Sequence, residues 1–150
     1  MNIVDIPKFD GLSVSSKFGI CGLPVRLDSY KTCSFGCAYC FANNRKVMEF
    51  EKTLKIADVN SIARRLKRVV TDKTYKKTHF LDVLIANGIT WHCGGMSDPL
   101  QPVEAKLGVT KSIVDVTNRY GISILFSTKS DTIYDVDARP DLHSLQLSVA

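Results

Sequence analysis

Three cysteines stand close together in the first third of the chain, at Cys33, Cys37 and Cys40. Gly36 lies between the first two, and a glycine lets the backbone curl tightly enough to bring the three thiols onto one face of the loop. Thiolates are the usual ligands of iron–sulfur clusters, and four of them normally hold a four-iron cluster. Because this loop supplies three, one iron would stay open to another ligand. The spacing therefore predicts a cluster site with an open position.

A structural zinc site is the alternative for the same loop, because tetrahedral zinc also binds thiolate and imidazole groups. Its fourth ligand would be Cys93 or His92, which stand together further along the chain. Zinc sites of this kind usually pair two short cysteine motifs, and this sequence has one, so the iron–sulfur interpretation is favoured. His79 and His143 are expected to be incidental.

The elements that position the cysteine loop follow from the pattern of apolar residues. Alternating or continuous apolar residues predict strands at 24–30, 89–93, 122–126 and 145–149. Apolar residues at helical spacing predict helices from Asp58 or Asn60 to Val69, over 80–87, over 103–117, and a short one between 130 and 140. A hairpin at Asn87-Gly88 competes with a helix end there, and the helix is preferred. Residues 1–22 predict at most one short strand.

This alternation of strands and helices predicts an α/β fold with parallel strands and right-handed crossovers. The first strand leads directly into the cysteine loop, the second into Gly94-Gly95, and the third into Ser127 and the residues after it. Function gathers at the carboxyl ends of the strands in such sheets, so we expect these three segments to lie together. Residues 1–150 are expected to form one domain.

Composition limits the possible surroundings of the protein. The chain has 150 residues, of which 45% are hydrophobic, and its formal charge is +5. It contains no apolar run long enough to span a bilayer, and its first residues lack the pattern of a signal peptide. Five cysteines, an odd number, fit a reducing compartment better than a disulfide framework, and Cys21 is expected to be a buried apolar residue. We expect a cytoplasmic protein without membrane association.

The positive charge is concentrated in one segment. It holds Arg64, Arg65, Lys67, Arg68, Lys73, Lys76 and Lys77. A basic face of this kind can follow the phosphates of a nucleic acid, whereas a solvated outer helix face is the more common reason for such a run. Tyr75 is the one aromatic residue within the segment, which is little to stack on bases, so the solvated face is favoured.

The cysteine loop and its surroundings resemble the radical S-adenosylmethionine (SAM) superfamily, which shares this spacing and an aromatic residue before the last cysteine, here Tyr39. The segments 28–33 and 94–104 are similar to the branch of spore photoproduct lyase, often called DNA-repair photolyase-like. The resemblance covers about 26–150 and implies a [4Fe-4S] cluster whose open iron binds SAM. Reductive cleavage of SAM would give a 5′-deoxyadenosyl radical for lyase-like chemistry, with repair of a DNA photoproduct as one candidate reaction.

The resemblance also implies roles for individual residues. Cys33, Cys37 and Cys40 would be the cluster ligands. Seven further residues would contact SAM: Tyr39 beside the adenine, Gly94 and Gly95 at the amino group together with Ser97 or Asp98, and Ser127 and Lys129 at the ribose and carboxylate. Lysine suits a carboxylate as a point charge. Ser148 is a weak further candidate. Cys93 is close to the position of a hydrogen-donating cysteine in that branch, but a buried strand cysteine is the favoured interpretation.

The same resemblance implies an incomplete fold. Radical SAM cores usually have six strand–helix units in an open, partial (β/α) barrel, and this sequence supplies about four parallel strands, so we expect the C-terminal part of the barrel to be lacking. The expected partners are an external electron donor of the flavodoxin or ferredoxin type, DNA as a candidate, and a second chain that completes the barrel. The alternative is a non-catalytic module that binds a metal cluster, or the truncated half of a split protein.

Overall fold

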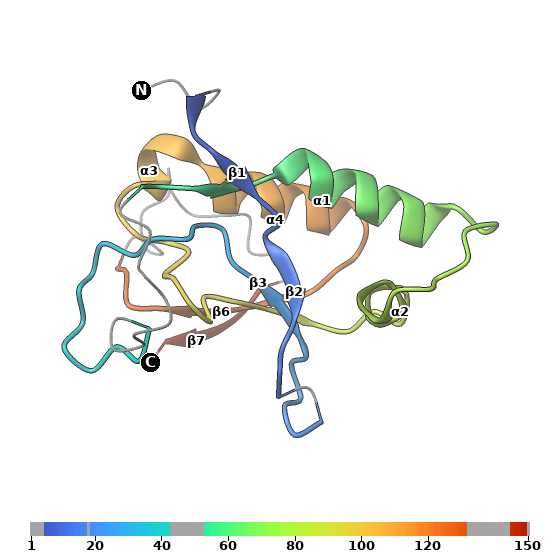
Figure 1. The fold of residues 1–150 in the computed structure, drawn as a ribbon, viewed down its shortest axis with the longest axis horizontal. Coiled ribbons are helices and arrows are strands. Elements are labelled where there is room, and N and C mark those ends of the chain that lie inside the picture. The colour runs from blue at the N-terminus through green and yellow to red at the C-terminus, as the bar shows by residue number, and fades with distance from the viewer. Residues whose placement is uncertain (1–4, 18, 43–52, 132–144, 150) are drawn as a thin grey trace.

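The computed structural model describes residues 5–17, 19–42, 53–131 and 145–149 (Figure 1). Its strands are β1 (Lys8–Phe9), β2 (Leu12–Val14), β3 (Val25–Leu27), β4 (Ile56–Ala57), β5 (Trp91–Cys93), β6 (Ile124–Thr128) and β7 (Leu145–Val149). Its helices are α1 (Val59–Leu66), the π-helical turn η2 (Lys67–Thr71), α2 (Phe80–Ala86), α3 (Glu104–Leu107) and α4 (Val109–Arg119). The described residues thus form a mixed α/β fold. They contain no helix that is both long and apolar enough to cross a membrane.

The main sheet has five strands in the order β2-β3-β5-β6-β7. The last four are parallel neighbours and correspond to the four strands expected from the sequence, whereas β2 pairs antiparallel with β3. A second, small sheet pairs β1 with β4 in parallel. The interpretation of the parallel strands as part of a barrel stays a prediction.

One face of the main sheet is buried beneath helices. Along β3, β5 and β6, alternate side chains are fully buried, including Leu27, Trp91 and Phe126, while those between them are half-buried. The buried side chains belong to one core with Ile62 of α1 and Ile113 of α4. Figure 1 shows α1, α3 and α4 on the same side of this sheet. The burial of this apolar layer is the main force that holds the strand exits in place.

Two of the expected helix ends are confirmed. Asp58 caps α1, because its Oδ1 accepts hydrogen bonds from the backbone N–H groups of Asn60 and Ser61 at 3.1 and 3.2 Å. The helix α2 ends at Asn87 and is followed by Gly88, whose φ of +68° is left-handed, so the helix was the correct choice over a hairpin.

The expectation of one helix over 103–117 is wrong. Gly108 has a φ of +58° and separates two helices, α3 and α4. The carboxylate of Glu104, on α3, accepts hydrogen bonds from the first N–H groups of α4, at Thr110 (3.0 Å) and Lys111 (2.9 Å). The strands β1 and β2 exceed the single short strand expected before residue 22, and β4, at Ile56–Ala57, was not expected. The helix expected between 130 and 140 falls almost entirely outside the described residues.

Candidate functional site

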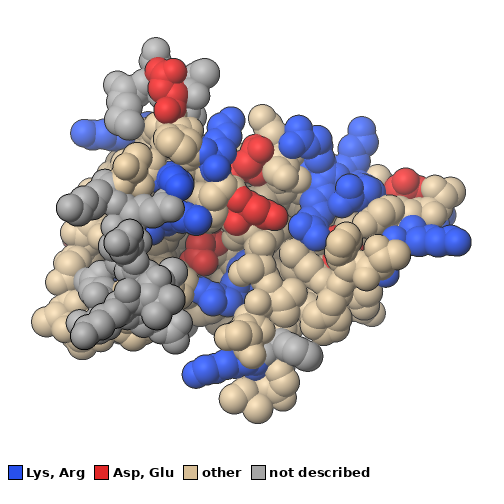
Figure 2. Space-filling model, viewed as in Figure 1, with Lys and Arg blue, Asp and Glu red and all other residues tan. Residues whose placement is uncertain are grey.

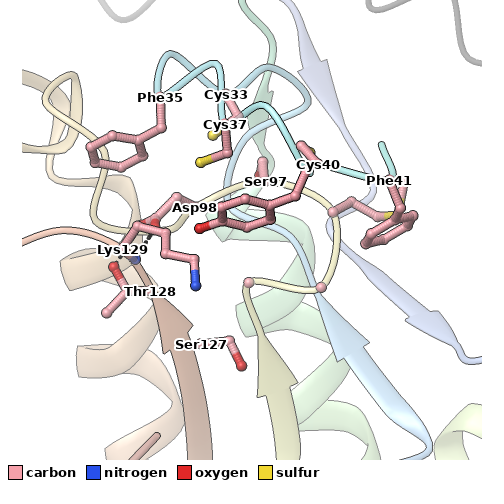
Figure 3. Close-up of a pocket in the computed structure, with 14 residues that line it drawn as sticks. Cys33, Phe35, Cys37, Cys40, Phe41, Ser97, Asp98, Ser127, Thr128 and Lys129 are labelled. Atoms are coloured by element: carbon pink, nitrogen blue, oxygen red, sulfur yellow. Dashed lines mark hydrogen bonds between the residues drawn. The ribbon is translucent and has the colours of Figure 1, made fainter. Parts of the chain in front are cut away.

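A cavity lies where the exits of β5 and β6 meet the cysteine loop (Figure 3). It encloses about 660 Å³, including solvent at its open mouth. All ten residues selected from the sequence line it: Cys33, Cys37, Tyr39, Cys40, Gly94, Gly95, Ser97, Asp98, Ser127 and Lys129. Sequence reasoning missed Phe35, Phe41, Met96 and Thr128, which complete the lining. Three segments far apart in the chain therefore converge on one cavity.

The turn after β5 must pass very close to β6. Gly94 has a φ of +103°, and a Cβ atom at this position would lie 2.1 Å from the carbonyl oxygen of Ser127. Any other residue would therefore force the exits of β5 and β6 apart. At Gly95, a Cβ atom would lie 3.3 Å from Nε of Arg26, on β3. The two glycines thus let the turn after β5 pass close to the exit of β6 and to Arg26 on β3.

Asp98 joins this turn to the exit of β6. Its Oδ1 accepts hydrogen bonds from the hydroxyl of Thr128 at 2.7 Å and from the N–H of Leu100 at 2.9 Å. Its Oδ2 accepts one from the N–H of Lys129 at 2.5 Å. Asp98 is only 7% exposed, so these bonds satisfy a buried charge that would otherwise be costly. The Asp98 carboxylate therefore holds the cavity wall together. Its contact with SAM stays a prediction.

Ser97 also has a partner within the protein. Its hydroxyl donates a hydrogen bond to the carbonyl oxygen of Tyr30 at 2.5 Å, and the side chain is buried. The Tyr30 hydroxyl in turn donates to the carboxylate of Glu104. Burial and the Glu104 carboxylate raise the pKa of Tyr30 above its usual range, so the phenol remains protonated. These contacts attach the residues just before the cysteine loop to the segment after β5.

Lys129 and Tyr39 face each other across the mouth of the cavity. The Nζ atom of Lys129 lies 5.6 Å from the centroid of the Tyr39 ring, within the range of a cation–π contact. Tyr39 is 73% exposed and Phe41 is 53% exposed, which is unusual for aromatic side chains. The mouth therefore combines a positive charge with two accessible aromatic rings.

Ser127 has a partner that sequence reasoning did not assign to it. Its hydroxyl lies 2.8 Å from Nε2 of His92, which stands on the half-buried face of β5. Burial and the charge of Arg26 lower the pKa of His92 below its usual value of 6.5, although Asp28 opposes the shift. His92 is therefore mostly neutral near pH 7. Strand alternation was the signal that could have found it, because Trp91 and Cys93 point into the core.

The three thiols line the same cavity but do not form a closed set. Figure 3 shows Cys33 and Cys37 turned toward the same part of the cavity, with Cys40 set apart on the side of Phe41. Across the described residues, no three His, Cys, Asp or Glu side chains gather closely enough to hold a metal ion. The donor types fit an iron–sulfur cluster, because three thiols stand on one exposed or half-buried loop. Closing the set needs a rotation of Cys40.

The fourth ligands considered for zinc lie away from the loop thiols. Cys93 is fully buried, its Sγ atom is 3.8 Å from the hydroxyl of Ser29, and it does not line the cavity. Burial raises the pKa of the Cys93 thiol, which disfavours the thiolate that a metal needs. His92 does not line the cavity either, and its Nε2 faces Ser127. This geometry gives no support to the zinc alternative, and it agrees with the interpretation of Cys93 as a buried strand residue.

The basic segment lies far from the cavity. Figure 2 shows Lys and Arg side chains gathered where Figure 1 places α1 and η2, at the end of the molecule opposite the cysteine loop. Several of its arginines already have acidic or aromatic partners. Arg65 is 2.6 Å from Asp82 and Arg64 is 4.0 Å from Asp58, while the guanidinium of Arg68 lies 4.8 Å from the ring centroid of Tyr75.

Comparisons of the chain with protein-family models, with curated proteins and with solved structures found no match.

Proposed function

We propose that this chain is a radical SAM iron–sulfur enzyme of the kind that its cysteine loop resembles. The observation that carries the proposal is the convergence of ten residues on one cavity. They were selected from three separate stretches of the sequence, and each lines the same space.

Different residues of the cavity would bind the iron–sulfur cluster and SAM. Cys33, Cys37 and Cys40 would hold the cluster once Cys40 turns toward the other two thiols. Gly94 and Gly95 would offer peptide groups to the polar end of SAM, and Lys129 would bind its carboxylate as a point charge. Bound together, an iron–sulfur cluster and SAM supply one-electron chemistry, and the protein supplies binding and orientation.

The substrate is a separate question within this proposal. DNA was suggested by the family resemblance and mildly supported by the basic segment, but that segment lies at the other end of the molecule from the cavity, and several of its arginines are partnered. A duplex bound there would not reach the thiols through the same contacts. A protein, a peptide or a small molecule is therefore an equally supported substrate, and photoproduct repair is not favoured.

The partners in this proposal follow from the chemistry. An external electron donor, of the flavodoxin or ferredoxin type, would have to approach the open mouth, where Tyr39 and Phe41 are exposed. The thiols require a reducing compartment, which agrees with a cytoplasmic location. A second chain that pairs with the sheet beyond β7 is also part of this proposal.

A non-catalytic metal-binding module is the second candidate function. The observation in its favour is the main sheet, whose four parallel strands in the described residues are fewer than the six that radical SAM cores usually have. Such a module would bind metal through its thiols but would have no reason to bind SAM.

Anaerobic reconstitution with iron and sulfide separates the two candidates. The reduced protein is then examined by electron paramagnetic resonance with and without SAM, and 5′-deoxyadenosine is measured after addition of dithionite. We expect a four-iron signal that changes with SAM, and its loss in Cys33→Ala but not in Cys21→Ala. A cluster whose signal ignores SAM would favour the non-catalytic module, and the absence of any cluster would refute both.

A further inference from the structure

The side chain of Gln101 reaches both sides of Cys33. Its amide nitrogen donates a hydrogen bond to the carbonyl oxygen of Thr32 at 2.7 Å. Its amide oxygen accepts one from the backbone N–H of Ser34 at 3.0 Å. Gln101 is only 2% exposed, so both ends of a polar side chain are buried and satisfied by these two peptide groups. The residue between those peptide groups is the first of the three cysteines.

The chemistry of the contact suits glutamine in particular. Thr32 presents a carbonyl and Ser34 presents an N–H, so the matching side chain must donate and accept at once, as a carboxamide does. A glutamate would place a second acceptor against the Thr32 carbonyl, and an asparagine would be one methylene too short. A leucine of similar volume would leave both peptide groups without these bonds, at the cost of burying unsatisfied polar atoms.

Gln101 is itself held from both directions along the chain. Asp98, three residues earlier, is bonded to the exit of β6 through Thr128 and Lys129. Glu104, three residues later, is 2% exposed and bonded to the hydroxyl of Tyr30 and to the start of α4. The amide of Gln101 is therefore presented from a fixed platform, and the position of Cys33 is tied to the core of the fold.

The other two cysteines are held differently. In the described part of the loop, the backbone hydrogen bond between them is local and runs from the N–H of Cys40 to the carbonyl oxygen of Cys37 at 3.0 Å. This bond forms a turn but does not tie either residue to the sheet. Figure 3 shows the consequence, since Cys40 stands apart from Cys33 and Cys37.

We propose that Gln101 is a positioning residue that fixes Cys33 as the preformed first ligand of the cluster, onto which Cys37 and Cys40 close when metal is bound. This inference rests on the proposed function for the identity of the metal group. The pair of hydrogen bonds from Gln101 to Thr32 and Ser34, here called the clamp, is a property of the metal-free chain. It makes Cys33 the ordered thiol of the loop, whereas Cys37 and Cys40 acquire their positions on loading.

The first test uses the metal-free wild-type protein and needs no variant. Amide hydrogen exchange is measured for the loop, and the rate of alkylation is measured for each of its cysteines. We expect the N–H of Ser34 to exchange at least about tenfold more slowly than that of Tyr39, because it is bonded to a buried acceptor. Equal exchange at the two positions would overturn the clamp whether or not a cluster ever binds.

The second test compares Gln101→Leu with a control of similar burial far from the cavity, Asp82→Asn, which removes a charge bonded to Arg65 and Tyr75. Outer partners of metal ligands typically contribute about 10- to 100-fold to metal affinity. We therefore expect Gln101→Leu to lose about that factor in iron uptake during reconstitution and to lose the protection of Ser34. Asp82→Asn should keep both, even if its melting temperature falls further.

The outcomes separate this inference from the proposed function. If the wild type binds no cluster, the proposed function fails, and the exchange data alone then decide whether Gln101 holds the backbone around Cys33. If the wild type binds a cluster and Gln101→Leu binds it equally well, the positioning role is overturned. Equal losses of iron uptake in Gln101→Leu and Asp82→Asn would also overturn it, because the loss would then follow stability.

Discussion

The two walls of the cavity differ in burial and in hydrogen bonding. The wall formed by Ser97 and Asp98 is almost fully buried, as is Gln101 nearby in the chain, and each of these side chains is bonded to a neighbouring strand exit or to the start of the cysteine loop. The wall formed by Tyr39 and Phe41 is largely exposed. One wall is thus set by buried hydrogen bonds, while the other is open to solvent. A site of this kind can hold a fixed reference point and still close around what it binds.

The largest loss of stability is expected from Gly94→Ala, which places a methyl group against the exit of β6. The Cβ atom of the alanine would lie 2.1 Å from the carbonyl oxygen of Ser127, and the alanine would also have to adopt a left-handed φ. We expect a loss of at least about 3 kcal/mol in the free energy of unfolding, measured with denaturant. The matched control is Gly88→Ala, where φ is also positive but no atom lies within 4 Å, so the loss should be about 1 kcal/mol. Equal losses would show that the close approach at Gly94 carries no weight.

A smaller loss is expected from Asp98→Asn. The variant keeps the shape but weakens three charge-assisted hydrogen bonds within the buried wall, so we expect a loss of about 2 kcal/mol in the free energy of unfolding. Asp72→Asn is the control, because Asp72 bonds the N–H and hydroxyl of Thr74 in an exposed loop, so its loss should be clearly smaller than that of Asp98→Asn. The contrast fails if the control costs as much as Asp98→Asn.

The exposed wall should tolerate Phe41→Ala with a change in unfolding free energy within about 0.5 kcal/mol. Phe41 is 53% exposed, whereas Leu100, next to the buried wall, is 1% exposed. Leu100→Ala should therefore lower the free energy of unfolding by about 3 kcal/mol. Thermal unfolding of both variants checks this. A large loss for Phe41→Ala would mean that this wall is also set by folding.

The smallest effect concerns the protonation of His92. Nuclear magnetic resonance should find its pKa below 6.5, because burial and Arg26 both disfavour the imidazolium. Since the unfolded chain then binds more protons than the folded one, stability should fall as pH drops below about 6.5. The fall ends once pH passes below the folded-state pKa. His92→Gln should remove this part of the pH dependence, and a pKa above 6.5 would contradict the arrangement.

The sequence allowed the strands and the meeting of their exits to be predicted, for a simple physical reason. Alternation of buried and half-buried residues marks β3, β5 and β6, and parallel neighbours bring their carboxyl ends to one edge. Residues placed just after those strands, such as Ser127 and Gly94, must then lie near the cysteine loop. The break at Gly108 was missed, although a glycine within a helical pattern is a weak point that could have signalled it.

Other features depend on contacts that no local pattern announces. Gln101 forms hydrogen bonds with Ser34 and Thr32, which lie 67 and 69 positions away in the sequence. An isolated glutamine after a proline-containing turn gives no sign of such partners. The same holds for Glu104, whose carboxylate caps a helix other than its own. The pairing of β1 with β4 involves two residues on each strand, which is too short for periodicity to reveal. The position of Cys40 relative to the other thiols depends on side-chain rotation, which spacing alone does not fix.

The complete burial of Cys93 gives the protein an internal reporter. This thiol sits on β5 between two neighbouring strands and is closed off from solvent, whereas the loop thiols are partly accessible. A bulky alkylating reagent can reach it only when the centre of the sheet opens. The rate at which the Cys93 adduct accumulates under native conditions therefore reports how often the centre of the sheet unfolds. Mass spectrometry can measure this rate alongside the faster labelling of the loop thiols.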